Sequence, residues 1–188
     1  MANLIVGLGN PGEAYRASRH NVGFRVVEEL ARRRGVRVNR LECNSLVGGD
    51  AAGEVLLAKP QTYMNRSGYA ARCLVERHGL EPAALLVVYD EVNLPLGRLR
   101  LRRGGSPAGH RGMESVIENL RTEEVPRLRL GIAPEDGPPG GEEKVDFVLG
   151  PFTAAEREPV EEMVQRAAEA CEAWLRDGVE QAMSRFNG

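Results

Sequence analysis

The sequence predicts an α/β fold: a single domain spanning residues 1–188, arranged as a three-layer α/β/α structure around a mixed, mostly parallel twisted sheet. Apolar strand segments alternate with amphipathic helical segments along the chain. The segment 85–89 is apolar throughout, which is typical of a strand buried on both faces. We find no internal repeat, low-complexity tail or linker, and 188 residues fit one domain.

The first half of the chain supplies a strand, a helix, a hairpin and a second helix. Residues 3–9 form a short apolar strand followed by a tight turn. Residues 21–34 have the helical spacing of apolar side chains and stop at Gly35. Residues 36–47 and 55–58 resemble a hairpin whose loop starts at Gly48, and residues 64–78 form a helix that ends at His78.

The second half continues the alternation after the apolar strand 85–89, with Asp90 at its carboxyl end. Residues 96–101 alternate leucine with arginine, as a half-buried strand does. The remaining elements are a helix at 110–121, a strand at 128–132, a loop at 134–141, a long helix at 154–176 and a short terminal helix. Trp174, on the long helix, is expected in the core.

The composition is that of an ordinary globular protein, with 42% hydrophobic residues, 28% charged residues and a net charge of −2. No apolar run approaches the ~18 residues of a membrane span, and no signal-peptide pattern precedes the first strand. The chain is therefore expected in the cytoplasm and away from membranes. Cys43, Cys73 and Cys171 show no zinc-ligand spacing and are predicted to be reduced structural thiols.

The basic residues are unevenly placed. All but Lys59 and Lys144 are arginine, and five arginines lie between Glu91 and Glu114 with no acidic residue among them. A local basic face on a mildly acidic protein favours a selective phosphate contact over general polyanion binding. Abundant arginine is also typical of a heat-adapted or compositionally biased genome, so both interpretations stay open.

Three polar residues are predicted to meet at one edge of the sheet. Asn10 follows the first strand, Asp90 ends the apolar strand, and His20 begins the next helix. Ligands of open α/β sheets bind at the carboxyl ends of the strands. An aspartate that orients an imidazole lets the other ring nitrogen take a proton from water. Taken singly, His20 and Asp90 also fit ordinary helix-start and turn residues.

No Gly-x-Ser-x-Gly elbow occurs, so the simplest chemistry is direct hydrolysis by a histidine-activated water. Gly7-x-Gly9-x-x-Gly12 matches a dinucleotide fingerprint, but the helix does not follow at once and the ribose-binding acid is absent. The glycine-rich loop 104–109 lacks the Lys-Ser/Thr end of a P-loop. It could still hold a phosphate or be a plain strand-to-helix connection.

The segment Tyr63-Met64-Asn65-Arg66-Ser67-Gly68 places an aromatic, a thioether and an amide at a helix start. Tyr63 could stack on a base or ribose, and Asn65 could bind a carbonyl. A buried tyrosine and a helix-capping asparagine are the structural alternatives.

Together these elements resemble the bacterial peptidyl-tRNA hydrolase family over residues 3–180. The resemblance lies in a series of motifs in a fixed order. They are Val6-Gly7-Leu8-Gly9-Asn10-Pro11-Gly12, Arg19-His20-Asn21-Val22-Gly23, Tyr63-Met64-Asn65-Arg66-Ser67-Gly68, Asp90-Glu91 with Leu94-Pro95, Gly109-His110, Arg127-Leu128-Arg129 with Gly131, and Phe147-Val148-Leu149-Gly150. The resemblance implies hydrolysis of the ester between a peptide and the 3′ ribose of tRNA, which recycles tRNA from dropped-off peptidyl-tRNA.

The resemblance also implies roles for individual residues. His20 is the general base, Asp90 orients it, and Asn10 separates N-blocked peptidyl-tRNA from free aminoacyl-tRNA. The implied substrate contacts and site-lining residues are Tyr15, Tyr63, Met64, Asn65 and His110, and the phosphate clamp is Arg102 with Arg129. Arg111 stands where the family has asparagine, so Arg111 either reaches a phosphate or weakens catalysis.

The family implies no cofactor, no metal, a monomer, and recognition of the acceptor stem and 3′ CCA end of tRNA. Some relatives of this fold bind RNA without hydrolysis, and a catalytically weakened RNA-binding relative is the rival hypothesis. An esterase of small substrates is a further alternative, although it would not need the arginines.

Overall fold

The computed structural model describes residues 2–188. Its centre is a seven-stranded mixed sheet with the order β2-β3-β4-β1-β5-β7-β6. The strands are β1 (Asn3–Gly7), β2 (Arg40–Glu42), β3 (Ser45–Gly49), β4 (Val55–Pro60), β5 (Leu85–Pro95), β6 (Leu99–Arg102) and β7 (Arg127–Ala133). The four central strands β4, β1, β5 and β7 run parallel, and β2, β3 and β6 are antiparallel to their neighbours. The predicted fold class is confirmed.

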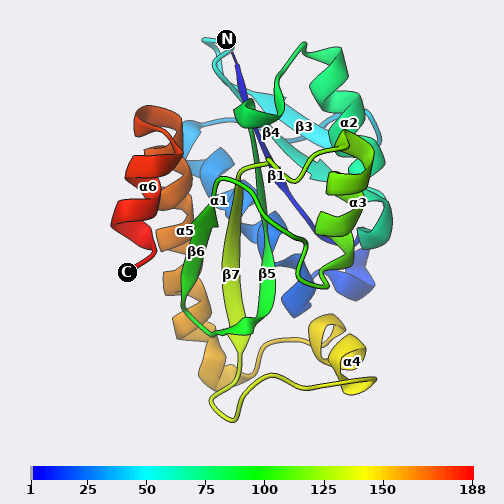
Figure 1. Ribbon diagram of the computed structural model, residues 1–188, viewed down its shortest axis with the longest axis vertical. Coiled ribbons are helices and arrows are strands. Elements are labelled where there is room, and N and C mark those ends of the chain that lie inside the picture. Colours follow the sequence, from blue (N-terminus) through cyan, green and yellow to red (C-terminus); the bar gives the residue numbers. More distant parts are fainter. Residues whose placement is uncertain (1) are drawn as a thin grey trace.

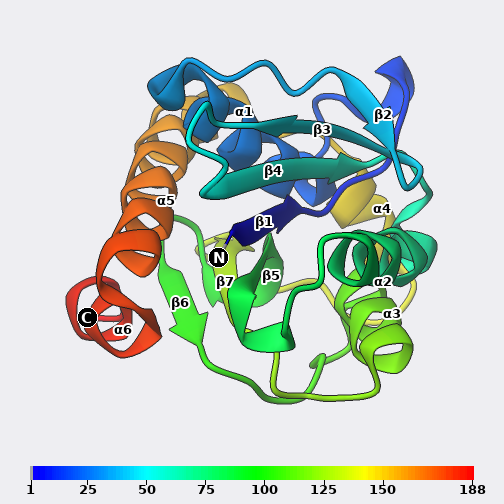
Figure 2. The same ribbon diagram turned by 90° about the horizontal axis from the view of Figure 1, so that it is seen from above.

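Helices cover both faces of the sheet, which makes three layers (Figures 1 and 2). Helices α1, α5 and α6 lie on one face, and α2 and α3 lie on the other. The α-helices are α1 (Val22–Arg34), α2 (Ser67–Arg77), α3 (Arg111–Leu120), α4 (Glu143–Leu149), α5 (Arg157–Asp177) and α6 (Val179–Phe186). The 3-10 turns are η1 (Glu13–Tyr15), η2 (Arg19–Asn21), η3 (Met64–Arg66), η4 (Pro82–Ala84) and η5 (Ala154–Glu156). Helix α4 lies beyond the carboxyl ends of the parallel strands, at the bottom of Figure 1.

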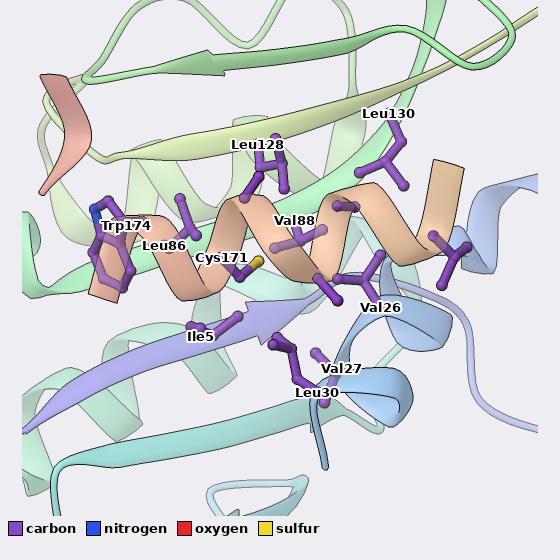
Figure 3. Packing of buried hydrophobic residues seen from close by; sticks show 14 of the residues in the cluster. Ile5, Val26, Val27, Leu30, Leu86, Val88, Leu128, Leu130, Cys171 and Trp174 are labelled. Atoms are coloured by element: carbon purple, nitrogen blue, oxygen red, sulfur yellow. The ribbon is translucent and has the colours of Figure 1, made fainter. Parts of the chain in front are cut away.

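Each face of the sheet carries its own hydrophobic cluster because successive strand residues point to opposite sides. Ile5, Leu86 and Val88 pack with α1 and α5, where the buried Trp174 closes one end of the cluster (Figure 3). Leu4 and Val87 pack on the other face under α2 and α3. The expectation that Trp174 belongs to the core is confirmed.

Two glycines bring α1 close to the sheet beside the site. A Cβ on Gly7 would lie 2.2 Å from the carbonyl oxygen of Gly23, and one on Gly23 would lie 2.4 Å from the carbonyl oxygen of Val88. Both distances are shorter than any real contact. Gly7, one glycine of the segment that resembles a dinucleotide fingerprint, is therefore a packing position between β1 and α1. This packing positions the start of α1, and His20 lies in η2 directly before that helix.

Several predicted boundaries were wrong. The segment 36–47 is not one strand, because a turn at Cys43 and Asn44, both with positive φ, divides it into β2 and β3. Gly48 and Gly49 belong to β3 rather than to the hairpin loop. Strand β5 continues past Asp90 to Pro95, and α4 lies in a segment for which no helix was predicted.

The prediction of three reduced thiols was also wrong for two of them. Cys43 and Cys73 form a disulfide between the β2–β3 turn and α2, whereas Cys171 is a free, buried thiol. Burial raises the pKa of the Cys171 thiol. The two bonded cysteines are 30 residues apart in sequence, so only the tertiary fold brings them together. Within residues 2–188, no helix has the length and apolar character required to cross a membrane.

Candidate active site

A cavity of about 580 Å³ opens at the carboxyl ends of the parallel strands. It is lined by residues from β5, η3, the start of α3 and α4. The predicted site residues among them are Asn10, His20, Tyr63, Met64, Asn65, Asp90, His110 and Arg111. The structure therefore brings eight of the eleven predicted site residues to one cavity, as expected for ligands of an open α/β sheet.

Asp90 is the buried centre of this site, with only 1% of its side chain exposed. His20 Nδ1 lies 2.9 Å from Asp90 Oδ1 and 2.8 Å from Oδ2. His110 Nε2 lies 3.0 Å from Asp90 Oδ1, and the two imidazole rings are 5.0 Å apart. The carboxylate thus binds one nitrogen of each histidine. Nε2 is the remaining ring nitrogen of His20, which lines the cavity.

The electrostatics of the cluster favour an ionised Asp90 and a basic His20. Burial alone would raise the pKa of Asp90, but its interactions with the two histidines outweigh burial and hold that pKa well below 3.8. Burial alone would lower the pKa of His20. The charge and hydrogen bond of Asp90 more than compensate, so the pKa of His20 lies above 6.5, while Lys144 opposes that rise.

Asn10 is buried and held in one orientation by its neighbours. Its Oδ1 accepts a hydrogen bond of 2.7 Å from the backbone N–H of Met64. Its backbone N–H donates to Asn21 Oδ1 at 2.8 Å, and Asn21 Nδ2 donates to its carbonyl oxygen at 2.9 Å. With Oδ1 occupied, the free end of the Asn10 side chain is the Nδ2 donor.

The segment from Tyr63 to Asn65 forms a wall of the cavity next to the start of α3. Met64 is buried and starts η3, which continues directly into α2. Tyr63 is 62% exposed and lines the cavity, so the alternative of a buried tyrosine is wrong. Asn65 is exposed and lines both this cavity and a smaller hollow next to Arg111.

Helix α4 closes the cavity on its outer side and adds Lys144 to the lining. The helix is fixed to the segment that carries His20. Arg19 donates to the carbonyl oxygen of Phe147 at 3.0 Å and stacks on the Phe147 ring, and its backbone N–H donates to Gly150. Sequence reasoning missed Lys144 because the glycine- and proline-rich segment before it indicates a loop.

Arg102 and Arg129 do not line the cavity; they lie on β6 and β7. Arg129 lies opposite Arg100 in the strand register, so these two share a face with Arg102. Arg129 Nε donates to Tyr89 Oη at 3.1 Å, and the Tyr89 ring packs 4.6 Å from the His110 ring. The three residues Arg100, Arg102 and Arg129 are called the arginine face below.

The arginine face carries little compensating negative charge. Its acidic neighbour within the described chain is Glu91, 3.9 Å from Arg129. Burial, together with the charges of Arg100 and Arg129, lowers the pKa of Arg102. Arg100 Nε is buried and has no hydrogen-bond partner among residues 2–188. Arg100 was missed as a site residue, although its alternation with Leu99 and Leu101 signalled a face shared with Arg102.

Two other predicted features lie outside the cavity. Tyr15 is half-buried in η1 and does not line it. The glycine-rich loop is tied by Arg127, which donates to the carbonyl oxygens of Ser106 and Glu123. A larger open groove of about 1340 Å³ lies on the other side of Asn10, but none of its lining residues is a histidine.

The lining of the catalytic cavity defines a class of enzyme. The described residues that line it include no serine, threonine or cysteine that could act as a nucleophile. The ligand atoms of His20, Asp90 and His110 lie within 4.8 Å of one another. Two imidazoles and a carboxylate are groups that could bind a metal ion. A histidine with one nitrogen on a buried carboxylate and the other free is the arrangement of a hydrolase that activates water.

Comparison with known proteins identifies the family. The sequence model described as "Peptidyl-tRNA hydrolase" matches residues 4–188. The peptidyl-tRNA hydrolase of Carboxydothermus hydrogenoformans is 50% identical over 186 residues, covering 98% of this chain and 97% of that protein. That of Synechococcus sp. (strain JA-3-3Ab) is 48% identical over 187 residues, covering 98% of this chain and 82% of that protein.

A solved structure of peptidyl-tRNA hydrolase from Acinetobacter baumannii superimposes with a TM-score of 0.90 at 34% identity, covering 100% of this chain and 95% of that one. The chain belongs to the peptidyl-tRNA hydrolase family, and its activity is the hydrolysis of peptidyl-tRNA, a carboxylic ester. The rival hypothesis of an RNA-binding relative without hydrolysis is not favoured by these comparisons.

Proposed function

We propose that His20 is the general base of this reaction and that water is the nucleophile. The observation that carries the proposal is the His20–Asp90 pair, whose second imidazole nitrogen belongs to a cavity with no serine, threonine or cysteine among its described lining residues. Water donates a proton to His20 Nε2 as its oxygen attacks the ester carbonyl. The tetrahedral intermediate then collapses, and the imidazolium returns the proton to the departing 3′ oxygen of the ribose.

Asn10 recognises the acyl group in this proposal. Its Oδ1 is occupied by Met64, so the Nδ2 donor is available to a carbonyl oxygen and to the oxyanion that develops from it. A free α-ammonium group is itself a donor and would meet another donor there. N-blocked substrates are therefore preferred over free aminoacyl-tRNA. Asn65, which is exposed and lines the same cavity, supplies a second amide.

The arginine face and the exposed Tyr63 bind the RNA. Arg102 and Arg129 contact a phosphate of the acceptor stem, and Arg100 contributes a third charge on the same face. Tyr63 stacks on a base or ribose of the 3′ CCA end, and Tyr15 and Arg111 contact the RNA at the rim. We propose that the protein acts as a monomer, in the cytoplasm where its substrate occurs.

The experiment that tests this proposal compares N-acetyl-aminoacyl-tRNA with unblocked aminoacyl-tRNA as substrates of the wild type and of His20→Ala. The variant is expected to lose about 10²–10⁴-fold in kcat while retaining tRNA affinity, because only the base is removed. His78→Ala is the matched control, since His78 lies at the far end of α2 and bonds Glu42. Full turnover by His20→Ala would overturn the proposal.

A further inference from the structure

His110 makes two contacts that together determine where its proton lies. Its Nδ1 accepts a hydrogen bond of 3.1 Å from the backbone N–H of Met113, and its Nε2 lies 3.0 Å from Asp90 Oδ1. A backbone N–H can only donate, so Nδ1 must present a lone pair. The ring proton is then on Nε2, which donates it to the carboxylate.

We propose that the start of α3 locks His110 in the Nε2–H tautomer, which makes His110 a positioning residue for Asp90 rather than a second base. This inference rests on the proposed function for its kinetic consequences but not for the tautomer itself. The histidine is the N-cap of α3, and its ring replaces the side-chain oxygen that usually accepts from this turn. Protonation of Nδ1 would break that cap.

The lock distinguishes two imidazoles that share one carboxylate. His20 uses Nδ1 for Asp90 and leaves Nε2 to the cavity, whereas both nitrogens of His110 are occupied. Asp90 Oδ1 receives a donor from each ring, and this pair of donors fixes the plane of the carboxylate. A fixed carboxylate holds the His20 ring in one orientation, as a base aimed at water requires.

The local sequence supports this arrangement at Gly112. A Cβ there would lie 2.5 Å from Met64 Sδ and 3.0 Å from His110 Cε1. Glycine at the second position of α3 therefore lets the His110 ring lie across the helix start while Met64 packs beside it. A side chain at this position would crowd both Met64 and the His110 ring.

The same lock opposes metal binding by the His20–Asp90–His110 cluster. A metal ion on His110 Nε2 would require the lone pair on that nitrogen and a proton on Nδ1. The Nδ1 proton would then face the Met113 N–H, donor against donor. The cluster has the composition of a transition-metal site, but the helix cap assigns the Nε2 position to a proton.

The direct test is the long-range proton–nitrogen spectrum of the full-length protein, labelled with ¹⁵N-histidine, at neutral pH. This spectrum shows which ring nitrogen of each histidine carries a proton. The chain has three histidines, so spectra of His110→Asn and His78→Gln assign the signals. We expect His110 to show a protonated Nε2 and an unprotonated Nδ1, unchanged by excess Zn²⁺. A proton on Nδ1, a doubly protonated ring, or a Zn²⁺-dependent shift of Nε2 would each overturn the inference, whatever the activity of the enzyme.

A kinetic test uses His110→Asn, whose side-chain oxygen can still cap α3 but cannot reach Asp90. We expect kcat to fall about ten- to hundredfold and KM for peptidyl-tRNA to change less than about twofold, because a charge-assisted hydrogen bond is lost without a substrate contact. The acid limb of kcat/KM should move to higher pH. His20 is faced by Asp90 from β5, His110 from α3 and Lys144 from α4, and the loss of one donor makes Asp90 a stronger acceptor for His20.

His78→Gln is the matched control and should leave kcat and the acid limb unchanged. A purely structural role for His110 would lower the melting temperature of His110→Asn without moving the acid limb. That result, or an unchanged kcat, would contradict the positioning role.

Discussion

The His20–Asp90–His110 cluster and the arginine face differ in how their charges are compensated. Asp90 is almost completely buried, yet each of its oxygens has an imidazole partner. The arginine face is partly exposed and has three cations near one another, with the carboxylate of Glu91 3.9 Å from Arg129. A buried, fully partnered charge can orient a reacting group, whereas surface cations that outnumber their acidic partners can bind an anionic ligand. The comparison predicts that mutations in the cluster affect kcat and those on the arginine face affect KM.

The largest effect is expected from Asp90→Asn. An amide in place of the carboxylate can donate to His20 Nδ1 and so favours the wrong tautomer, with the proton on Nε2. We expect kcat to fall about 10³–10⁴-fold with little change in tRNA affinity. Single-turnover hydrolysis and a filter-binding titration measure the two quantities. A variant that loses affinity and keeps kcat would remove the distinction between the two regions.

The pH dependence of the wild type follows from the raised pKa of His20. As the proposed general base, His20 must be neutral to accept a proton, so kcat/KM should fall as the pH decreases through a value above 6.5. The contribution of His20 to the free energy of unfolding depends on pH in the opposite direction. The raised pKa favours the folded state fully below pH 6.5, and this contribution disappears as the pH rises through the folded value. A pH–rate profile whose acid limb lies below 6.5 would show that Asp90 does not raise the pKa of His20.

The arginine face gives the next effect. Arg102→Ala and Arg129→Ala should each raise KM for peptidyl-tRNA roughly tenfold and make its salt dependence less steep, because each would remove a proposed phosphate contact. Hydrolysis of a tRNA-free ester should be unchanged. Arg103→Ala is the matched control, since it removes the same charge from the next residue, which is paired with Glu180 on α6. Equal effects on both substrates would contradict the clamp.

The predictability of these regions from sequence differs for a physical reason. Asn10, His20 and Asp90 were predictable because strand ends and helix starts have local signals, and parallel strands end at one edge. Lys144 was not predictable, because α4 forms in a segment whose local sequence indicates a loop. This helix is held in place by Arg19, which is distant in sequence. The contact between His110 and Asp90 was not predictable either, because it joins residues 20 positions apart and no local pattern encodes it.

The Cys43–Cys73 disulfide lies outside both regions and provides the smallest expected effect on activity. It closes a loop of 30 residues that contains β3, β4 and the segment from Tyr63 to Asn65. In the chain-entropy account, such a loop stabilises the folded state by about 3–4 kcal/mol. Cys73→Ser should therefore lower the melting temperature by about 10 °C, at roughly 2–4 °C per kcal/mol for a protein of this size.

Both kcat and KM of Cys73→Ser should be unchanged at temperatures well below its transition. The reason lies in the site, because Met64 is held directly by Asn10 Oδ1 and Ser67 Oγ donates to the carbonyl oxygen of Met64. These contacts keep the cavity wall in place without the cross-link. Oxidised and reduced wild type provide the paired measurement on one sequence. A rise in KM on reduction would show that the wall depends on the disulfide, and equal melting temperatures would show that the disulfide contributes nothing to stability.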